Sequence, residues 1–262
     1  MVRAVLFDLD DTLVVEEPVA AETFAATARV AAERHELDAA ALATGARARA
    51  RELWWAGASH PYCQRIGISS WEGLWCRFEG GAPELAGLRA WAPDYRREAW
   101  RLALAEQGVE DPSLAEELGE RFGVERRARH RTHADARAAL DALSHEHRLA
   151  IVTNGASCLQ REKLAASGLA ECFHAVVVSG DLGTAKPDVA VFAHALDALG
   201  ARADEAVMVG DTLERDVEGA LAAGLRAVWV NRGANPEPVA PPDGVVEVRD
   251  LTDLARALEA LG

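Results

Sequence analysis

The 262-residue sequence has no long hydrophobic run. No stretch reaches the roughly 18 consecutive apolar residues that a membrane-spanning helix needs, and the first strand-like run, Val2 to Phe7, stops at Asp8. We therefore expect a cytoplasmic protein without a signal peptide or a membrane partner. Hydrophobic side chains still make up 50% of the chain, which is enough for one large domain or two small ones and excludes disordered and collagen-like classes.

Basic residues are scarce, with 28 Lys plus Arg against 42 Asp plus Glu and a formal net charge of −14. Such an excess of negative charge repels polyanions, so a nucleic acid polymer is not an expected partner. No pattern in the sequence indicates an oligomeric state.

Cysteine is also rare, and the sequence contains no C-x-x-C pair. Because the cysteines have apolar or helical neighbours, we expect buried free thiols and neither disulfides nor zinc ligands. Reduced thiols agree with a cytoplasmic location. The four residues are Cys63, Cys76, Cys158 and Cys172.

Six short apolar runs predict β-strands, one at the start and five after residue 147. Ala- and Leu-rich helical segments lie between most of them. This alternation predicts an α/β fold with a Rossmann-like open parallel sheet and helices on both faces. The predicted strands are Val2–Phe7, Leu149–Thr153, Ala175–Val178, Ala206–Val209, Ala227–Val230 and Val245–Val248.

A long helical insert separates the first two strands and runs from about Glu16 to Arg131. We expect an all-helical domain at residues 16–131, inserted into an α/β domain formed by residues 1–15 and 132–262. Glycine and proline predict breaks between its helices. These breaks are expected near Gly57–Pro61, Gly80–Pro83, Pro93 and Pro112.

Two groups of residues in the insert have two interpretations each. Six of the seven tryptophans lie there, and they either fill the core of the helical domain or contribute one or two rings to a substrate pocket. Four arginines, Arg126, Arg127, Arg129 and Arg131, form either a solvated helix face or a contact to an anionic substrate. Outside the insert, the proline-rich stretch Asn235–Gly244 is predicted to be a surface loop.

Carboxylates follow the first predicted strand directly, in the order Asp8-Leu9-Asp10-Asp11-Thr12. Extended geometry points side chains i and i+2 the same way, so Asp8 and Asp10 would converge on one ligand while Asp11 turns away. Two carboxylates that close repel each other unless a cation or proton lies between them. The alternative is that Asp10 or Asp11 caps the next helix.

Two later segments suit a phosphate group. Thr153-Asn154-Gly155 ends the second strand with a hydroxyl and backbone N–H groups close to a predicted helix N-terminus, although this triplet also forms ordinary turns. Lys186 lies at the start of another helix, where a cation opposes the helix dipole and an anionic partner would explain its presence.

A third carboxylate, Asp211, follows the fourth predicted strand. Ligands of parallel α/β sheets bind outside the carboxyl ends of the strands, so Asp211 is expected near Asp8 and Asp10. Three carboxylates around one point make a hard-oxygen site of the kind that Mg²⁺ accepts, together with water and a substrate phosphate.

This ordered set resembles the haloacid dehalogenase (HAD) superfamily, whose four motifs are D-x-D-x-T, a strand-ending Ser or Thr, a Lys, and G-D-x-x-x-x-D. The corresponding residues are Asp8 to Thr12, Thr153, Lys186, and Gly210 to Asp216. The resemblance covers the whole chain, because a helical insert between the first two motifs corresponds to the type 1 cap of that family.

The resemblance implies roles for the carboxylates. Asp8 would be the nucleophile that forms an aspartyl-phosphate, and Asp10 would be the acid/base that protonates the leaving oxygen and then activates water. Magnesium would be held by the Asp8 side chain, the backbone carbonyl of Asp10, and Asp211.

The resemblance also implies how phosphate is held. Thr153 and Lys186 would bind the phosphoryl oxygens, and Asn154 would add its backbone N–H. Thr12 would donate its hydroxyl to the loop or to phosphate, and Asp216 would steady the loop or Lys186 from behind.

Within the superfamily, residues 153–164 and 209–216 most resemble N-acylneuraminate-9-phosphatases and pyrimidine 5'-nucleotidases. The implied function is a Mg²⁺-dependent phosphatase for a small phosphorylated metabolite such as a sugar phosphate, a nucleotide or a biosynthetic intermediate. The alternatives are a 2-haloacid dehalogenase, which usually lacks an acid where Asp10 stands, a phosphomutase, and a catalytically silent binding protein. The intact set of costly charges argues against the last.

Overall fold

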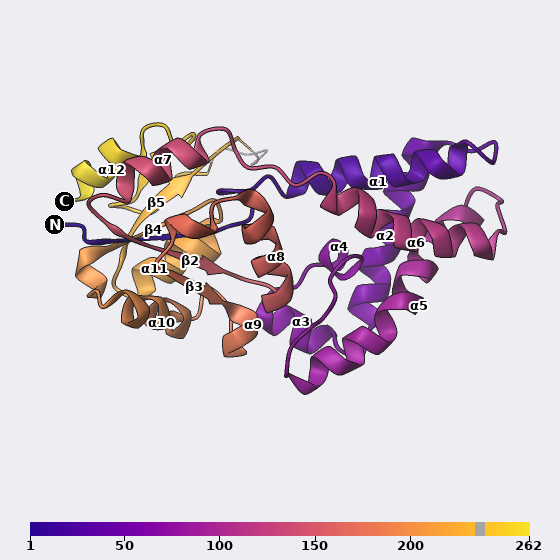
Figure 1. Cartoon of the computed structure of the whole chain (residues 1–262), viewed down its shortest axis with the longest axis horizontal. Coiled ribbons are helices and arrows are strands. Elements are labelled where there is room, and N and C mark those ends of the chain that lie inside the picture. Colours follow the sequence, from indigo (N-terminus) through magenta and orange to yellow (C-terminus); the bar gives the residue numbers. More distant parts are fainter. Residues whose placement is uncertain (234–238) are drawn as a thin grey trace. The chain divides into compact units, whose positions relative to one another are not determined.

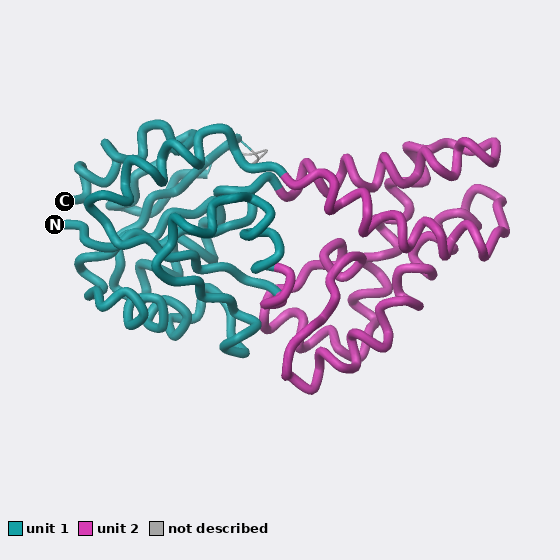
Figure 2. Tube along the Cα trace, viewed as in Figure 1, with its two compact units in different colours: residues 1–15, 131–155, 160–262 teal, residues 16–130, 156–159 magenta. Residues whose placement is uncertain are grey.

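The computed structural model describes residues 1–233 and 239–262, so part of the predicted loop Asn235–Gly244 lies outside the described residues. The chain divides into two compact units (Figure 2), which we call the α/β unit and the helical unit. The helical unit also takes in residues 156–159, which lie outside the predicted insert at residues 16–131. The α/β unit comprises Met1–Val15, Arg131–Gly155 and Gln160–Gly262, and the helical unit comprises Glu16–His130 and Ala156–Leu159.

A six-stranded parallel sheet forms the centre of the α/β unit (Figure 1), in the order β3-β2-β1-β4-β5-β6. The chain moves outward from β1 to β3 and then crosses back, so the switch point of the sheet lies between β1 and β4. The predicted Rossmann-like α/β fold is confirmed. The strands are β1 (Ala4–Phe7), β2 (Arg148–Thr153), β3 (Ala175–Val178), β4 (Ala206–Gly210), β5 (Arg226–Val230) and β6 (Val246–Val248).

Helices cover both faces of the sheet (Figure 1). Alternate residues of the buried strands pack against the helices on opposite faces. In β1, Val5 and Phe7 belong to the core that includes α7 and α12, while Ala4 and Leu6 belong to the core that includes α10. The helices of this unit are α7 (Ala136–Leu143), α8 (Ser157–Ser167, which begins in the helical unit), α9 (Ser179–Leu182), α10 (Val189–Leu199), α11 (Gly219–Ala222) and α12 (Leu254–Leu261). Shorter turns are η1 (Ala170–Cys172), η2 (Ala203–Glu205) and the π-helical η3 (Leu213–Glu218).

Six helices make up the inserted segment, and tryptophan fills much of its core. Trp54, Trp75 and Trp100 are buried, as the core interpretation predicts, whereas 60% of Trp55 is exposed. The helices are α1 (Glu17–Ala32), α2 (Ala39–Ala56), α3 (His60–Ile66), α4 (Ser70–Gly73), α5 (Pro83–Ala105) and α6 (Pro112–Arg127).

The predicted break at Pro93 is wrong, because Pro93 lies inside the continuous helix α5. Proline removes one backbone donor and disfavours a helix interior. Tertiary packing offsets that cost here, since Ala92 and Tyr95 on either side are buried in the core. The Tyr95 hydroxyl also donates a hydrogen bond to the Ser70 carbonyl at 2.6 Å.

Arg126 is not part of a solvated helix face, which corrects that interpretation for this residue. Only 1% of Arg126 is exposed, and its guanidinium pairs with the buried Glu16 carboxylate. The guanidinium also lies over the Trp75 ring, 4.8 Å from its centroid. Arg127 likewise turns inward, donating from Nη2 to the Trp75 carbonyl at 2.9 Å.

The two segments that join the insert to the α/β unit pair with each other. Val14 and Thr132 form an isolated antiparallel bridge, and the Val15 N–H donates to the Arg131 carbonyl at 3.0 Å. The chain therefore leaves and re-enters the α/β unit at one place.

All four cysteines are free, as expected, but Cys158 and Cys172 are only half-buried. Among the described residues, no helix combines the length and the apolar character that crossing a membrane requires.

The Glu16–Arg126 pair generates a stability prediction. We expect Arg126→Met to lower the free energy of unfolding by about 3–5 kcal/mol, because it deprives the buried Glu16 carboxylate of this partner. The double variant Glu16→Gln/Arg126→Met should recover part of that loss. Arg101→Met, which removes an exposed pair with Glu98, is the matched control and should cost less than about 1 kcal/mol. Urea unfolding measures all three, and equal losses for Arg126→Met and Arg101→Met would contradict the prediction.

Candidate active site

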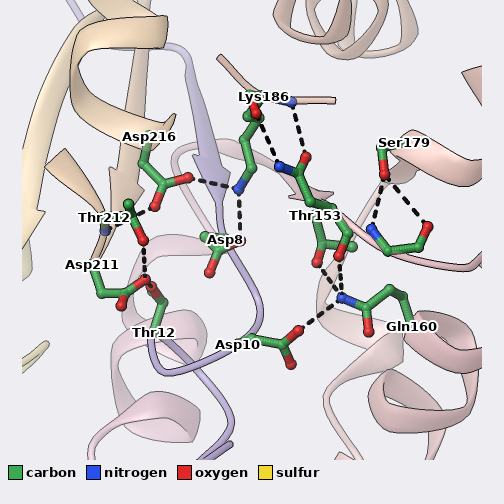
Figure 3. A network of polar contacts seen from close by, with 12 residues as sticks. Asp8, Asp10, Thr12, Thr153, Gln160, Ser179, Lys186, Asp211, Thr212 and Asp216 are labelled. Carbon is green, nitrogen blue, oxygen red and sulfur yellow. Dashed lines mark hydrogen bonds and ion pairs between the residues drawn. The ribbon is translucent and has the colours of Figure 1, made fainter. Parts of the chain in front are cut away.

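The predicted site residues gather where the central strands of the α/β unit end (Figure 3). Asp8 directly follows β1, Thr153 is the last residue of β2, and Asp211 directly follows β4. The parallel register pairs Phe7 with both Ile151 and Val209, so these three strand ends lie side by side. The site therefore lies beside the switch point of the sheet, where parallel α/β sheets bind ligands.

Lys186 joins two of the carboxylates. Its Nζ lies 2.6 Å from Asp8 Oδ1 and 2.6 Å from Asp216 Oδ1, and all three residues are buried. Burial by itself lowers the pKa of Lys186, but the two carboxylates outweigh it and the net shift is upward. Lys186 is consequently a fixed ammonium ion between Asp8 and Asp216.

The turn after β4 is built to bring Asp216 back to the strand end. The second oxygen of Asp216 accepts the Thr212 backbone N–H at 3.0 Å, and η3 spans the intervening residues. Gly210 permits this approach, because a Cβ at that position would lie 2.4 Å from the Asp216 carboxylate carbon. This packing explains why glycine precedes Asp211.

Asp8, Asp211 and Asp216 form an acidic group that could bind a metal ion, since one oxygen from each lies within 4.8 Å of the others. Burial and the neighbouring acids raise the pKa of Asp8 to about 7, although Lys186 opposes that shift. The same two causes raise the pKa of Asp211 to about 8. Three carboxylates and one ammonium carry a net charge of −2 when ionised, so the donor set fits a divalent cation with oxygen ligands.

Asp10 points elsewhere, toward helix α8 (Figure 3). Its carboxylate oxygens both lie 3.0 Å from Lys163 Nζ, and Oδ2 also accepts from Gln160 Nε2 at 2.8 Å. Among the described residues, the group of acids that could hold a metal ion does not include it. The expected convergence of Asp8 and Asp10 assumed an extended strand, but β1 ends at Phe7 and the alternation of side chains ends with it.

Asn154 holds the backbone of Lys186 in place. Its side-chain Nδ2 donates to the Lys186 carbonyl at 3.0 Å, and the Lys186 N–H donates to Asn154 Oδ1 at 2.9 Å. The Asn154 side chain thus positions a lysine, a role beyond the backbone N–H that the family resemblance implies for this residue. Thr12 is fully buried, with its hydroxyl 3.5 Å from Asp211 Oδ1.

Sequence reasoning assigned no role to Gln160 and Lys163, which the structure places at the site. Gln160 Nε2 lies 2.7 Å from Thr153 Oγ1 as well as contacting Asp10, and Lys163 is completely buried. Their spacing of three residues puts both on one face of α8. The available signal was Lys163, a charged residue four positions after the apolar Leu159 and therefore on the same helix face.

The family to which the motifs point also matches most of the chain. A model described as a haloacid dehalogenase-like hydrolase matches residues 2–224, which includes every site residue named above.

Similar proteins point the same way. The phosphoserine phosphatase of Thermus thermophilus is 42% identical over 260 residues, covering 98% of this chain and 100% of the relative. The N-acylneuraminate-9-phosphatase of Rattus norvegicus is 35% identical over 171 residues, covering 64% of this chain and 69% of the relative. Both relatives are named as phosphatases.

Solved structures share the fold. The crystal structure of YfnB from Bacillus subtilis, described as a proposed HAD hydrolase and bound to magnesium, covers 98% of each chain with a TM-score of 0.63. Its sequence identity of 23% supports the fold alone.

The close approach of Gly210 to Asp216 generates the next prediction. We expect Gly210→Ala to destabilise the protein by about 1–3 kcal/mol, because the new methyl group must displace the Asp216 carboxylate from Lys186. Gly81→Ala is the matched control, since no atom lies within 4 Å of a Cβ built there. Thermal unfolding should show a loss for Gly210→Ala only, and an unchanged melting temperature for that variant would refute the packing argument.

Proposed function

Because this chain belongs to the haloacid dehalogenase-like hydrolase family, we propose that it is a magnesium-dependent phosphatase that cleaves a small phosphate monoester through an aspartyl-phosphate. The observation that supports this most directly is the group of three acids, buried Asp8, half-buried Asp211 and buried Asp216, with Lys186 between Asp8 and Asp216. Its net negative charge calls for a divalent cation, which would offset the burial and the repulsion between acids that raise the pKa of Asp8 and Asp211.

Magnesium would be held by Asp8, the backbone carbonyl of Asp10, and Asp211. Both oxygens of Asp216 are already bonded, one to Lys186 and one to the Thr212 N–H, which leaves Asp8 and Asp211 as the side-chain ligands. The metal would supply positive charge that keeps these carboxylates ionised and draws phosphate oxygens toward the nucleophile.

Catalysis would begin with attack of an Asp8 oxygen on phosphorus, which forms the aspartyl-phosphate as the ester oxygen leaves. Lys186 and the Thr153 hydroxyl would bind phosphoryl oxygens and stabilise their charge. Asp10 would give its proton to the leaving oxygen and then take one from the water that cleaves the aspartyl-phosphate.

A 2-haloacid dehalogenase fits the same residues less well. Displacement of halide from carbon needs a carboxylate nucleophile but neither a cation nor a proton donor. The Asp211 and Asp10 carboxylates would then have no role in the reaction. Keeping their negative charges close to the buried nucleophile Asp8 would cost free energy without a functional gain.

Among small phosphate esters, phosphoserine is the substrate that we propose first. The phosphoserine phosphatase relative matches 98% of this chain and therefore includes the helical insert, where substrate choice in this family largely resides. The N-acylneuraminate-9-phosphatase relative matches only 64%.

Phosphate release tests the proposed function directly. With Mg²⁺, the protein should release inorganic phosphate from phosphoserine faster than from N-acylneuraminate 9-phosphate, pyrimidine nucleoside monophosphates and sugar phosphates. EDTA should abolish release, and added Mg²⁺ should restore it. Activity that persists in chelator would refute the metal requirement, while a preference for another ester would refute only the substrate. Halide release from a 2-haloacid would favour the dehalogenase.

The two acids of the first motif should behave differently. Asp8→Asn should abolish turnover and any phosphoenzyme, because the nucleophile is gone. Asp10→Asn should slow hydrolysis by about two to four orders of magnitude. With p-nitrophenyl phosphate, whose leaving group hardly needs a proton, phosphoenzyme should accumulate in Asp10→Asn and be seen as a mass increase after acid quench. Turnover by Asp8→Asn would overturn these roles.

A further inference from the structure

Two side chains of α8, Lys163 and Gln160, hold the Asp10 carboxylate away from the acidic group. Asp10 lies beyond the carboxyl end of β1, on the loop that also carries Asp8, yet within the described part of the chain its carboxylate accepts hydrogen bonds from Gln160 and Lys163 of α8. The acid that would exchange protons with substrate is therefore oriented by one helix, and the nucleophile by Lys186.

Lys163 donates hydrogen bonds to both carboxylate oxygens of Asp10. Its Nζ lies 3.0 Å from each, so the ammonium restricts rotation of the carboxylate as well as neutralising its charge. The Lys163 side chain is 0% exposed, while that of Asp10 is 25% exposed. The exposed part of Asp10 is the part that a substrate could reach.

Gln160 links Asp10 to Thr153. Its Nε2 lies 2.8 Å from Asp10 Oδ2, 2.7 Å from Thr153 Oγ1 and 2.7 Å from the Asn154 carbonyl. An amide nitrogen carries two hydrogens, so these three acceptors compete for it. If the Asp10 carboxylate turns toward a substrate, both hydrogens of Gln160 Nε2 become available to the two remaining acceptors, Thr153 Oγ1 and the Asn154 carbonyl.

On this basis we propose that Lys163 and Gln160 are positioning residues: Lys163 orients the carboxylate of Asp10 for proton exchange with the leaving oxygen, and Gln160 couples that orientation to the phosphate-binding Thr153. The inference rests on the proposed phosphatase function. A purely structural role for the two side chains predicts a uniform loss of activity, whereas a positioning role predicts a loss that depends on the leaving group.

The test compares kcat/KM for two esters, because kcat/KM reports the steps up to phosphoenzyme formation when that step is irreversible. We expect Lys163→Met to lower kcat/KM for phosphoserine, whose alkoxide leaving group needs a proton, by about tenfold to a hundredfold. For p-nitrophenyl phosphate, whose leaving group hardly needs one, kcat/KM should stay within about threefold, while kcat falls because the water step still requires Asp10.

Gln160→Met supplies the second variant, which also carries the test if Lys163→Met does not fold. It should show the same dependence on the leaving group and, in addition, raise KM for both esters because Thr153 loses its partner. Arg161→Gln is the matched control on α8: its side chain is 52% exposed, it pairs with Asp181, and both kinetic constants should match those of the parent. Circular dichroism melting verifies that each variant is folded.

The outcomes separate the two proposals. A parent protein that hydrolyses no phosphate ester with Mg²⁺ refutes the proposed function. If the parent is active on both esters but the folded Lys163→Met and Gln160→Met variants lose kcat/KM equally for both, or not at all, the positioning role is wrong and the phosphatase assignment stands.

Discussion

The bridge from Lys186 to Asp8 and Asp216 is the interaction on which the rest of the site depends. A buried ammonium between two buried carboxylates is stable only with close contacts on both sides, and both distances are 2.6 Å. Several local features maintain this geometry: the Asn154 side chain holds the Lys186 backbone, and Gly210 leaves room for Asp216. Asp8 is thereby fixed at the end of β1.

The charged residues at the site in the α/β unit form two groups, one around Lys186 and one around Asp10, and the two groups have different electrostatic surroundings. Around Lys186, burial together with an excess of acids over bases raises the pKa of Asp8 and Asp211, and the excess negative charge suits a divalent cation. Around Asp10 the balance is different, because Lys163 matches its charge and Gln160 adds a neutral donor. This division is what a nucleophile and a separate acid/base require, since each needs its own electrostatic environment.

The helical unit has its own stabilising arrangement, in which aromatic rings surround buried charge. Trp75 lies beneath the Arg126 guanidinium, which pairs with Glu16 at the start of the insert. Under the proposed function, this insert is the part of the chain where relatives are expected to differ in substrate. The full-length match to a phosphoserine phosphatase is for that reason more informative about substrate than partial matches.

The sequence by itself determined the parallel α/β fold and the family, because strand periodicity and the order of the motifs are local properties of the chain. It did not determine where the Asp10 side chain turns, because β1 ends at Phe7 and alternation no longer applies. Only the tertiary structure decided that Pro93 stays inside a helix, that Arg126 is buried, and that α8 contributes Lys163 to the site. Each of these depends on packing between segments far apart in the chain, whose free energy exceeds the local preference and leaves no periodic signal in the sequence.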